Sequence, residues 1–178
     1  VAVVPGSDAA ARTSTALARL DARKVATYEF DLDWQVDPAL VAPEGGHVHT
    51  GSIAATLPPG GESVARIVEA SRAHATVSYD PNARPSLMGE PAVAAAVVEH
   101  LIGLADVVKA SDEDVAWLHG ATPEEAVERW AGLGPSLVMI TRGPDGVLVW
   151  CAGETRSFPT TDVTVADTVG AGDSFMSG

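Results

Sequence analysis

The sequence of 178 residues has little cysteine, little basic charge and no long hydrophobic run, and each shortage excludes a class of protein. Its single cysteine, Cys151, cannot form an internal disulfide, which favours a reducing, cytoplasmic setting. Eleven Lys and Arg against 24 Asp and Glu give a formal net charge of -13, which argues against nucleic acid or an anionic membrane as a partner. No stretch approaches the roughly 18 to 20 apolar residues that a membrane span requires. The Walker pattern of P-loop kinases is also absent.

What is present is the composition of a globular domain, with 46% hydrophobic and 20% charged residues. Apolar, β-branched runs alternate with segments of helical period, separated by short Gly and Pro punctuation. This order is typical of βαβ units around a parallel sheet, so we predict the α/β fold class. The chain begins with Val1 and shows no signal-peptide pattern, and we expect it to be part of a longer protein.

The predicted strands and helices follow one another with short connections. The segment 80–85 contains two prolines and follows the carboxyl end of a predicted strand, where open α/β sheets bind their ligands. Residues 143–146 predict a turn into an antiparallel strand, and residues 1–24 have the least ordered pattern. We expect strands at 25–30, 47–50, 76–79, 105–109, 136–141 and 147–150, and helices at 62–74, 91–104, from 111 onward and at 122–131.

The most informative segment, 167–175, reads Asp-Thr-Val-Gly-Ala-Gly-Asp-Ser-Phe. Its small residues stand directly before an expected helix start, where unpaired backbone N–H groups and the helix dipole attract an anion such as phosphate. The carboxylate of Asp173 beside that site could accept the proton of an attacking hydroxyl group. A tight turn in which Asp173 merely caps the helix is the simpler alternative.

This segment resembles the second signature of the pfkB (ribokinase-like) carbohydrate kinase family, and the chain as a whole resembles its fructokinase-like branch. The resemblance implies a three-layer αβα core with a β lid, of which about 1–35 would form the lid strands and their connection and about 36–178 the core. It implies that Asp173 is the catalytic base. It also implies an anion hole made by Gly170, Ala171 and Gly172, and a monovalent cation such as K⁺ held by Asp167 and the carbonyl group of Val169.

The segment 141–146, Thr-Arg-Gly-Pro-Asp-Gly, is similar to the family's Thr-x-Gly-x-x-Gly nucleotide segment. The resemblance implies that Thr141, Gly143 and Gly146 bind ATP, whereas the residues alone favour an ordinary hairpin.

Two further segments resemble the family's ligand-facing loops. The segment 79–85 is similar to the Phe-Asp-Pro-Asn-x-Arg loop of the fructokinase-like and 2-keto-3-deoxygluconate-kinase-like branches. We assign Arg84 to the nucleotide, because its planar donors suit phosphate, and Asn82 to the sugar. A capped turn with a solvated Arg84 is the alternative. The segment 49–53 resembles the strand end that faces the sugar, which implicates Ser52.

One segment departs from the family pattern. Where the family has Asn-x-x-Glu, which organises Mg²⁺ and phosphates through water, this chain has Ser111 and Asp114. Two interpretations remain open. Ser111 could bind the nucleotide with Asp114 in the Mg²⁺ network, or the two residues could form a capping box that starts a helix.

The resemblance thus implies an enzyme, a carbohydrate kinase, that transfers the γ-phosphoryl group of ATP to a small sugar, with fructose as the first choice and Mg²⁺ as cofactor. It also implies a homodimer formed through the lid. The alternative substrates are 2-keto-3-deoxygluconate, ribose and a nucleoside. The non-enzymatic alternative is a truncated or inactive module that binds sugar or nucleotide.

A GDSL-type esterase is a remote alternative, because residues 172–175 also resemble the Gly-Asp-Ser block of that class. Such an enzyme needs a histidine downstream of Ser174, and all five histidines precede it. The pfkB resemblance covers only the middle of that family's domain and lacks the sugar-contacting first strand and the helices that close the adenine pocket. We therefore expect residues 1–178 alone to be inactive.

Overall fold

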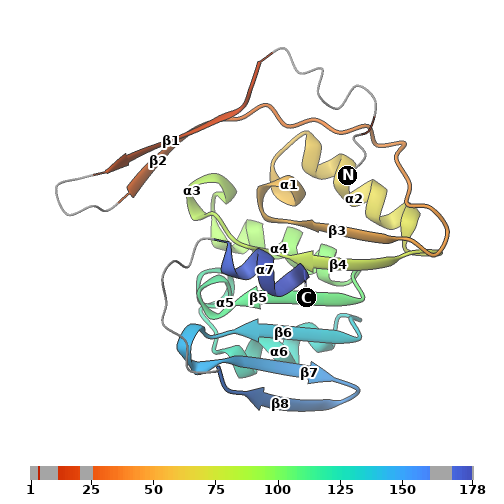
Figure 1. The fold of residues 1–178 in the computed structure, drawn as a ribbon, viewed down its shortest axis with the longest axis vertical. Coiled ribbons are helices and arrows are strands. Elements are labelled where there is room, and N and C mark those ends of the chain that lie inside the picture. The colour runs from red at the N-terminus through yellow and green to blue at the C-terminus, as the bar shows by residue number, and fades with distance from the viewer. Residues whose placement is uncertain (1–3, 5–11, 21–25, 161–169, 178) are drawn as a thin grey trace.

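The computed structural model describes residues 4, 12–20, 26–160 and 170–177 (Figure 1). Its main feature is a six-stranded sheet with the strand order β3-β4-β5-β6-β7-β8. The first four strands are parallel and the last two are antiparallel to their neighbours. Their bounds are β3 His47–Gly51, β4 Thr76–Asp80, β5 Val107–Ser111, β6 Leu137–Thr141, β7 Val147–Cys151 and β8 Glu154–Phe158. The predicted α/β class is confirmed.

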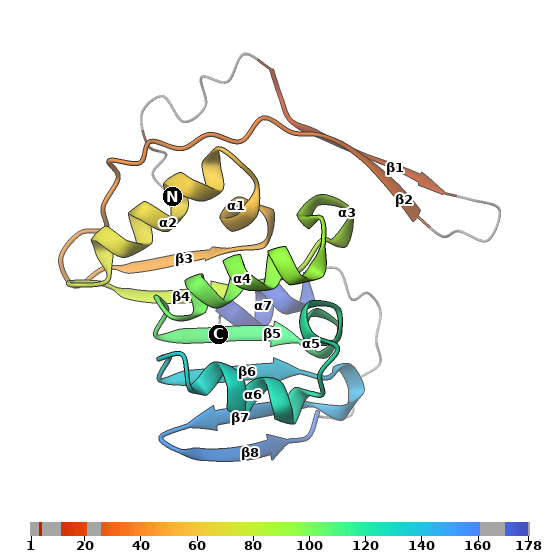
Figure 2. The same cartoon turned by 180° about the vertical axis from the view of Figure 1, so that it is seen from behind.

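Helices cover both faces of this sheet. Figures 1 and 2 show α4 and α6 on one face and α7 on the other. Helices α1 to α6 connect the parallel strands in pairs, so each crossover returns the chain to the same edge of the sheet. Their bounds are α1 Ser52–Thr56, α2 Gly60–Ser71, α3 Pro85–Met88, α4 Pro91–Ile102, α5 Asp112–His119, α6 Pro123–Ala131 and α7 Ala171–Ser177.

The core lies between the sheet and the helices α4, α5 and α6. The central strands β4 and β5 are buried along most of their length, as expected for strands that are covered on both faces, and they include the buried polar residues Ser78, Asp80 and Lys109. Trp130 of α6 is the largest fully buried side chain. The other large side chains with less than 2% exposure are Val68, Val77, Tyr79, Val98, Leu101, Ile102, Val108, Val115, Val127, Val138 and Ile140.

Two helices begin where the sequence predicts, because their caps are local. Thr122 and Glu125 form a capping box ahead of α6, with Pro123 in the first turn. Ser111 and Asp114 form a second capping box ahead of α5. The capping-box interpretation of Ser111 and Asp114 is therefore confirmed.

Local patterns did not predict two strands. Strand β1 (Thr15–Leu20) pairs antiparallel with β2 (Ala26–Asp31), although the pattern of residues 1–24 is the least ordered in the chain. Lid strands within about 1–35 were implied only by the family resemblance. The local pattern fails here because the alanine-rich segment gains its strand form from pairing with β2, which no pattern within the segment reveals. Strand β8 was missed for the same reason, since its five residues are all exposed and it is held by β7.

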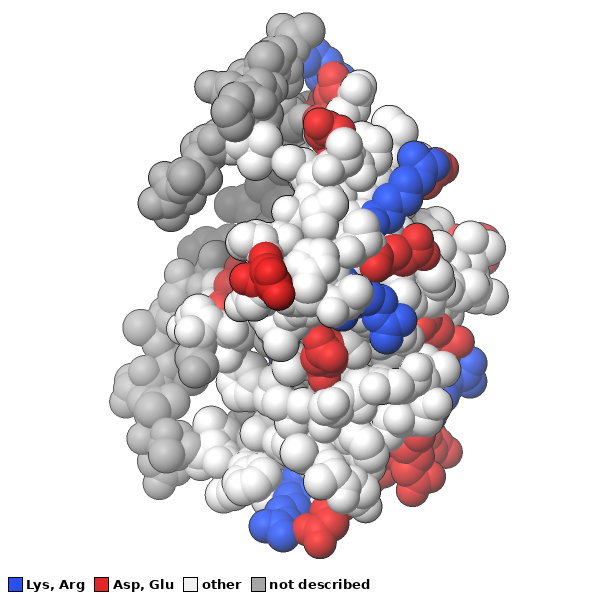
Figure 3. Space-filling model, turned by 90° about the vertical axis from the view of Figure 1, so that its right-hand side faces the viewer, with Lys and Arg blue, Asp and Glu red and all other residues white. Residues whose placement is uncertain are grey.

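The hairpin β1–β2 projects away from the six-stranded sheet (Figures 1 and 2). On the face drawn in Figure 3, basic side chains lie beside acidic ones and form no continuous basic patch among the described residues. No helix in the described part of the chain is long and apolar enough to cross a membrane.

A polar cluster ties α4, α5 and α6 together on the face of the sheet opposite α7. The indole N–H of Trp130 donates to Nε2 of His119 at 3.2 Å, and Nε2 lies 3.7 Å from Oε1 of Glu99. Glu99 also forms an ion pair with Arg129. Because Nε2 accepts the Trp130 hydrogen bond, the imidazole of His119 is neutral in this arrangement. Burial lowers the pKa of His119, and Arg129 adds to this, while Glu99 acts in the opposite direction.

This cluster predicts that the protein loses stability as the pH falls below about 6.5, the unfolded pKa of histidine. The unfolded chain binds a proton at His119 in that range, whereas the folded chain resists it until its own, lower pKa is reached. The free energy of unfolding should be measured by urea titration at about pH 7.5 and about pH 5.5. His119→Gln, which does not titrate, should show a smaller loss between the two values. An equal loss in both proteins would contradict the prediction.

Candidate active site

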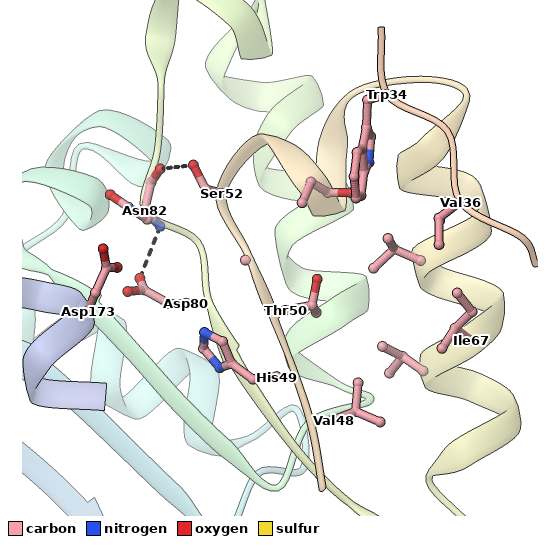
Figure 4. A pocket seen from close by; sticks show the side chains of 14 residues that line it. Trp34, Val36, Val48, His49, Thr50, Ser52, Ile67, Asp80, Asn82 and Asp173 are labelled. Atoms are coloured by element: carbon pink, nitrogen blue, oxygen red, sulfur yellow. Dashed lines mark hydrogen bonds between the residues drawn. The ribbon is translucent and has the colours of Figure 1, made fainter. Parts of the chain in front are cut away.

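The carboxyl ends of β3 and β4 and the first turn of α7 surround a cavity of about 430 Å³ (Figure 4). Three residues predicted from the sequence to face the sugar, Ser52, Asn82 and Asp173, all line this cavity. Asp80 joins Asn82 and Asp173 on one side, and the opposite wall is apolar, with contributions from Trp34 and from Val36 and α2. The structure therefore brings Ser52 and Asp173, which are 121 positions apart in the sequence, to the same cavity.

Two lining residues have an unusual backbone conformation. Ser52 has a φ of 50° and Asn82 a φ of 37°, in the region that residues other than glycine rarely adopt. The Ser52 hydroxyl donates to the carbonyl oxygen of Asn82 at 3.1 Å, so the two residues hold each other. Strain of this kind persists where the surroundings enforce it, and it is concentrated at functional sites.

Hydrogen bonds within the loop after β4, and one to Asp114 of α5, hold this loop in place. The N–H of Asn82 donates to Oδ1 of Asp80 at 3.1 Å, and the N–H of Ala83 donates to Oδ1 of Asp114 at 2.7 Å. Nη1 of Arg84 donates to Oδ1 of Asn82 at 2.7 Å and to the carbonyl oxygens of Asn82 and Ala83. Arg84 is exposed, and Nη1 stabilises the loop that carries Asn82.

Asp114 is buried, with 8% exposure, and both of its carboxylate oxygens already accept hydrogen bonds from the protein. Oδ1 accepts from Ala83, and Oδ2 accepts from the N–H and the hydroxyl of Ser111, each at 2.8 Å. Asp114 thus fastens the loop after β4 to the start of α5. A nucleotide contact by Ser111 and a place for Asp114 in the Mg²⁺ network stay predictions beside this structural role.

Sequence reasoning missed the buried ion pair between Lys109 and Asp80. Nζ of Lys109 lies 2.9 Å from Oδ2 of Asp80, and each side chain is 5% exposed. Burial raises the pKa of Asp80, and the hydrogen bond and charge of Lys109 offset part of that rise. The sequence feature that could have predicted this ion pair is a single lysine in an apolar strand that is expected to be buried.

Helix α7 begins directly after Gly170, so Ala171 and Gly172 lie in its first turn and not ahead of it as predicted. Gly170 adopts a φ of 74°, and its carbonyl oxygen accepts from the N–H of Ser174 at 2.9 Å. A Cβ atom on Gly172 would lie 2.7 Å from Nζ of Lys109, so the first turn of α7 comes close to the buried ammonium group. The sequence had suggested only that small residues admit a ligand. The predicted cation ligands Asp167 and Val169 lie outside the described residues.

The predicted nucleotide segment lies at the same edge of the sheet but does not line the cavity. Thr141 ends β6 as the register partner of Ser111, and Gly143 begins a 3₁₀ turn (Gly143–Asp145) with a φ of 52° and open space around it. Gly146 has a structural reason to be glycine, because a Cβ there would lie 2.0 Å from the carbonyl oxygen of Phe158. The two groups of predicted site residues therefore lie side by side, one at β3 and β4 and the other at β5 and β6.

Comparison with known proteins agrees with this geometry. Residues 6–178 match the sequence profile of the pfkB family carbohydrate kinases. A fructokinase of Klebsiella pneumoniae is 34% identical over 182 residues, which cover 96% of this chain and 59% of that protein. The crystal structure of fructokinase from Vibrio cholerae O395 in apo form superposes with a TM-score of 0.79 at 31% identity, covering 94% of this chain and 60% of that one. The same enzyme with fructose, ADP and calcium ion bound gives a TM-score of 0.76 at 31% identity, covering 94% and 57%. Aminoimidazole riboside kinase from Salmonella enterica, complexed with aminoimidazole riboside and an ATP analogue, gives 0.70 at 28% identity, covering 80% and 48%.

The layered sheet and the cavity at its carboxyl edge thus define an α/β protein with a ribokinase-like fold. The chain belongs to the pfkB family of carbohydrate kinases. It spans about three fifths of the length of the Klebsiella pneumoniae fructokinase that it matches. Membership of this family favours the kinase interpretation of residues 172–175 over the esterase alternative.

Proposed function

We propose that the protein is an ATP-dependent sugar kinase whose acceptor is fructose. The observation that carries the proposal is the position of Asp173, an exposed carboxylate in the first turn of α7 that lies with Asn82 and Asp80 on the polar side of the cavity (Figure 4). The cavity offers carboxylate, amide and hydroxyl groups on one side and an apolar wall on the other, which suits a sugar. The fructokinase relatives support fructose among the possible acceptors.

In the proposed reaction Asp173 accepts the proton of a sugar hydroxyl group while the hydroxyl oxygen attacks the γ-phosphorus of ATP. The new bond joins the sugar oxygen to phosphorus, and the bond from the γ-phosphorus to the bridging oxygen breaks, so that ADP leaves. The proton on Asp173 then passes to solvent. We propose that the N–H groups of Gly170, Ala171 and Gly172 donate to the oxygens of the transferred group.

The proposed nucleotide contacts are Thr141, Gly143, Gly146 and the donors of Arg84 other than Nη1. Mg²⁺, when bound with ATP, neutralises phosphate charge. Bound Mg²⁺ usually keeps several waters and needs only one or two carboxylates besides the phosphates of the nucleotide, and we propose Asp114 for this network. The K⁺ site at Asp167 and Val169 stays a prediction.

The experiment that tests the proposal measures ADP release by the intact natural protein with ATP and a panel of fructose, ribose, 2-keto-3-deoxygluconate and a nucleoside. We expect kcat/KM to be highest with fructose, by about tenfold or more, since a site built to hydrogen-bond a substrate discriminates strongly against poor matches. Preference for another sugar would refute fructose and retain the kinase. Absence of sugar-dependent ADP release, with sugar binding in calorimetry, would favour the binding-module alternative.

We also propose that the hairpin β1–β2 is the contact of a homodimer. It projects from the body of the protein, and the side chain of Leu17 on it is half exposed. A dimer would cover apolar surface of this kind. Light scattering of the active preparation should give the mass of two chains, and the mass of one chain would refute the proposal.

A further inference from the structure

Lys109 is a charged residue in the middle of a buried strand. Its neighbours Val108 and Ala110 are fully buried, and Lys109 itself is 4% exposed. Lysine is almost never this buried unless it is paired, and here the pair is with Asp80 of the adjacent strand β4. The ammonium group is therefore held at one defined place beneath the cavity.

The ammonium group also contacts the segment that carries the proposed base. A Cβ atom on Gly172 would lie 2.7 Å from Nζ of Lys109, so the first turn of α7 packs against the ammonium group. Lysine has three N–H donors, of which Asp80 takes one among the described residues. The remaining donors and the charge are available to α7 and its approach.

Stability alone does not account for this arrangement. Taking two charges out of water costs about as much as their attraction returns, and apolar replacements of similar volume are often as stable. Burial raises the pKa of Asp80, and the hydrogen bond and charge of Lys109 act in the opposite direction. The Lys109–Asp80 pair therefore points to a role in positioning the segments that it contacts.

Asp80 also connects the ion pair to the loop that carries Asn82. Its Oδ2 accepts from Lys109, while its Oδ1 accepts from the N–H of Asn82 at 3.1 Å. One buried carboxylate thus links the lysine beneath α7 to the loop that carries Asn82. The segments that carry Asp173 and Asn82, both on the polar side of the cavity, therefore share a single point of support.

We propose that Lys109 is a positioning residue of the active site, which holds the first turn of α7, and with it Asp173, at a fixed distance from Asn82 through its ion pair with Asp80. Lys109 does not contact the substrate, because it lies beneath Gly172 and is buried. The catalytic part of this inference rests on the proposed kinase function.

The first test replaces Lys109 by Met, which keeps the length of the side chain and removes its charge. We expect kcat to fall by about 100-fold, because a shift of about 1 Å in a reacting group costs that much, while KM for sugar and ATP changes by less than about threefold. Hydrogen exchange of the amides in 170–177, measured without substrate, should become faster, and exchange in 123–131 should not change. The matched control is Arg129→Met, which breaks the ion pair with Glu99 on the opposite face and should leave the exchange of 170–177 unchanged.

The second test removes both charges in Asp80→Asn/Lys109→Met, where residue 80 can still accept the N–H of Asn82. This variant keeps the proposal testable if Lys109→Met alone does not fold. It should be more stable than Lys109→Met, yet kcat should remain low and exchange of 170–177 fast. Recovery of kcat together with stability would overturn the proposal, as would unchanged exchange in both variants. If the unaltered protein phosphorylates no sugar, the proposed function fails, while the exchange measurements still decide whether Lys109 holds α7.

Discussion

Asp173→Asn is expected to lower kcat for sugar-dependent ADP release by about 10³-fold, because an amide cannot accept the proton of the attacking hydroxyl group. Asparagine has the same shape as aspartate, so the sugar and ATP should still bind and KM should change little. Asp173 is exposed in the first turn of α7, so the free energy of unfolding of the variant should stay within about 0.5 kcal/mol of the unaltered value. A coupled assay for ADP measures the turnover.

The matched control for this variant is Glu128→Gln, which removes one carboxylate from the exposed face of α6 on the other side of the sheet. It should leave kcat and KM unchanged, which separates loss of the base from loss of one negative charge. If Asp173→Asn kept more than a few per cent of the turnover, Asp173 would not be the base.

Gly51→Ala is expected to damage both stability and turnover. Gly51 is the register partner of Asp80, and a Cβ on it would lie 2.2 Å from the carbonyl oxygen of Asp80. The φ of Gly51 is 174°, which any residue adopts, so the obstacle is space alone. The ends of β3 and β4 must separate, and overpacking of this kind costs about 1–3 kcal/mol of unfolding free energy. Because Ser52 and Asp80 move with these strand ends, kcat/KM should fall by about 100-fold.

Chemical denaturation and the ADP assay together measure these two effects. Gly103→Ala is the matched control, because Gly103 has a φ of -64° and a Cβ there would meet its nearest atom at 3.4 Å. That variant should match the unaltered protein in turnover and differ by less than about 1 kcal/mol in stability. Unaltered stability and turnover in Gly51→Ala would show that the strand ends tolerate separation and that the cavity does not depend on their spacing.

Much of the regular structure could be predicted because its signals are local. The strands expected at 47–50 and 76–79 each end one residue short of β3 and β4, and the helix expected at 122–131 is α6 with its Thr122 cap. Hydrophobic period, caps and proline positions act within a dozen residues, so they can be recognised in the chain itself. The strand expected at 105–109 lies two residues before β5, since an apolar run does not define its own ends.

The two strands that were missed show the limit of prediction from local patterns. Neither the Thr15–Leu20 segment nor the Glu154–Phe158 segment has the alternation of a half-buried strand. Each becomes a strand by pairing with a neighbour, and pairing depends on a partner and a register that lie outside the segment.

The sequence by itself determined the fold class, the family resemblance and the candidates Asp173, Asn82 and Ser52, because each depends on a short contiguous motif. Only the tertiary structure decided that Lys109 meets Asp80, 29 positions away, that Asp114 holds Ala83 instead of standing free, and that Gly172 lies close to an ammonium group. These contacts join different strands and helices, and they follow from the register of the sheet and the packing of α7 on it. No pattern along a single segment contains that information.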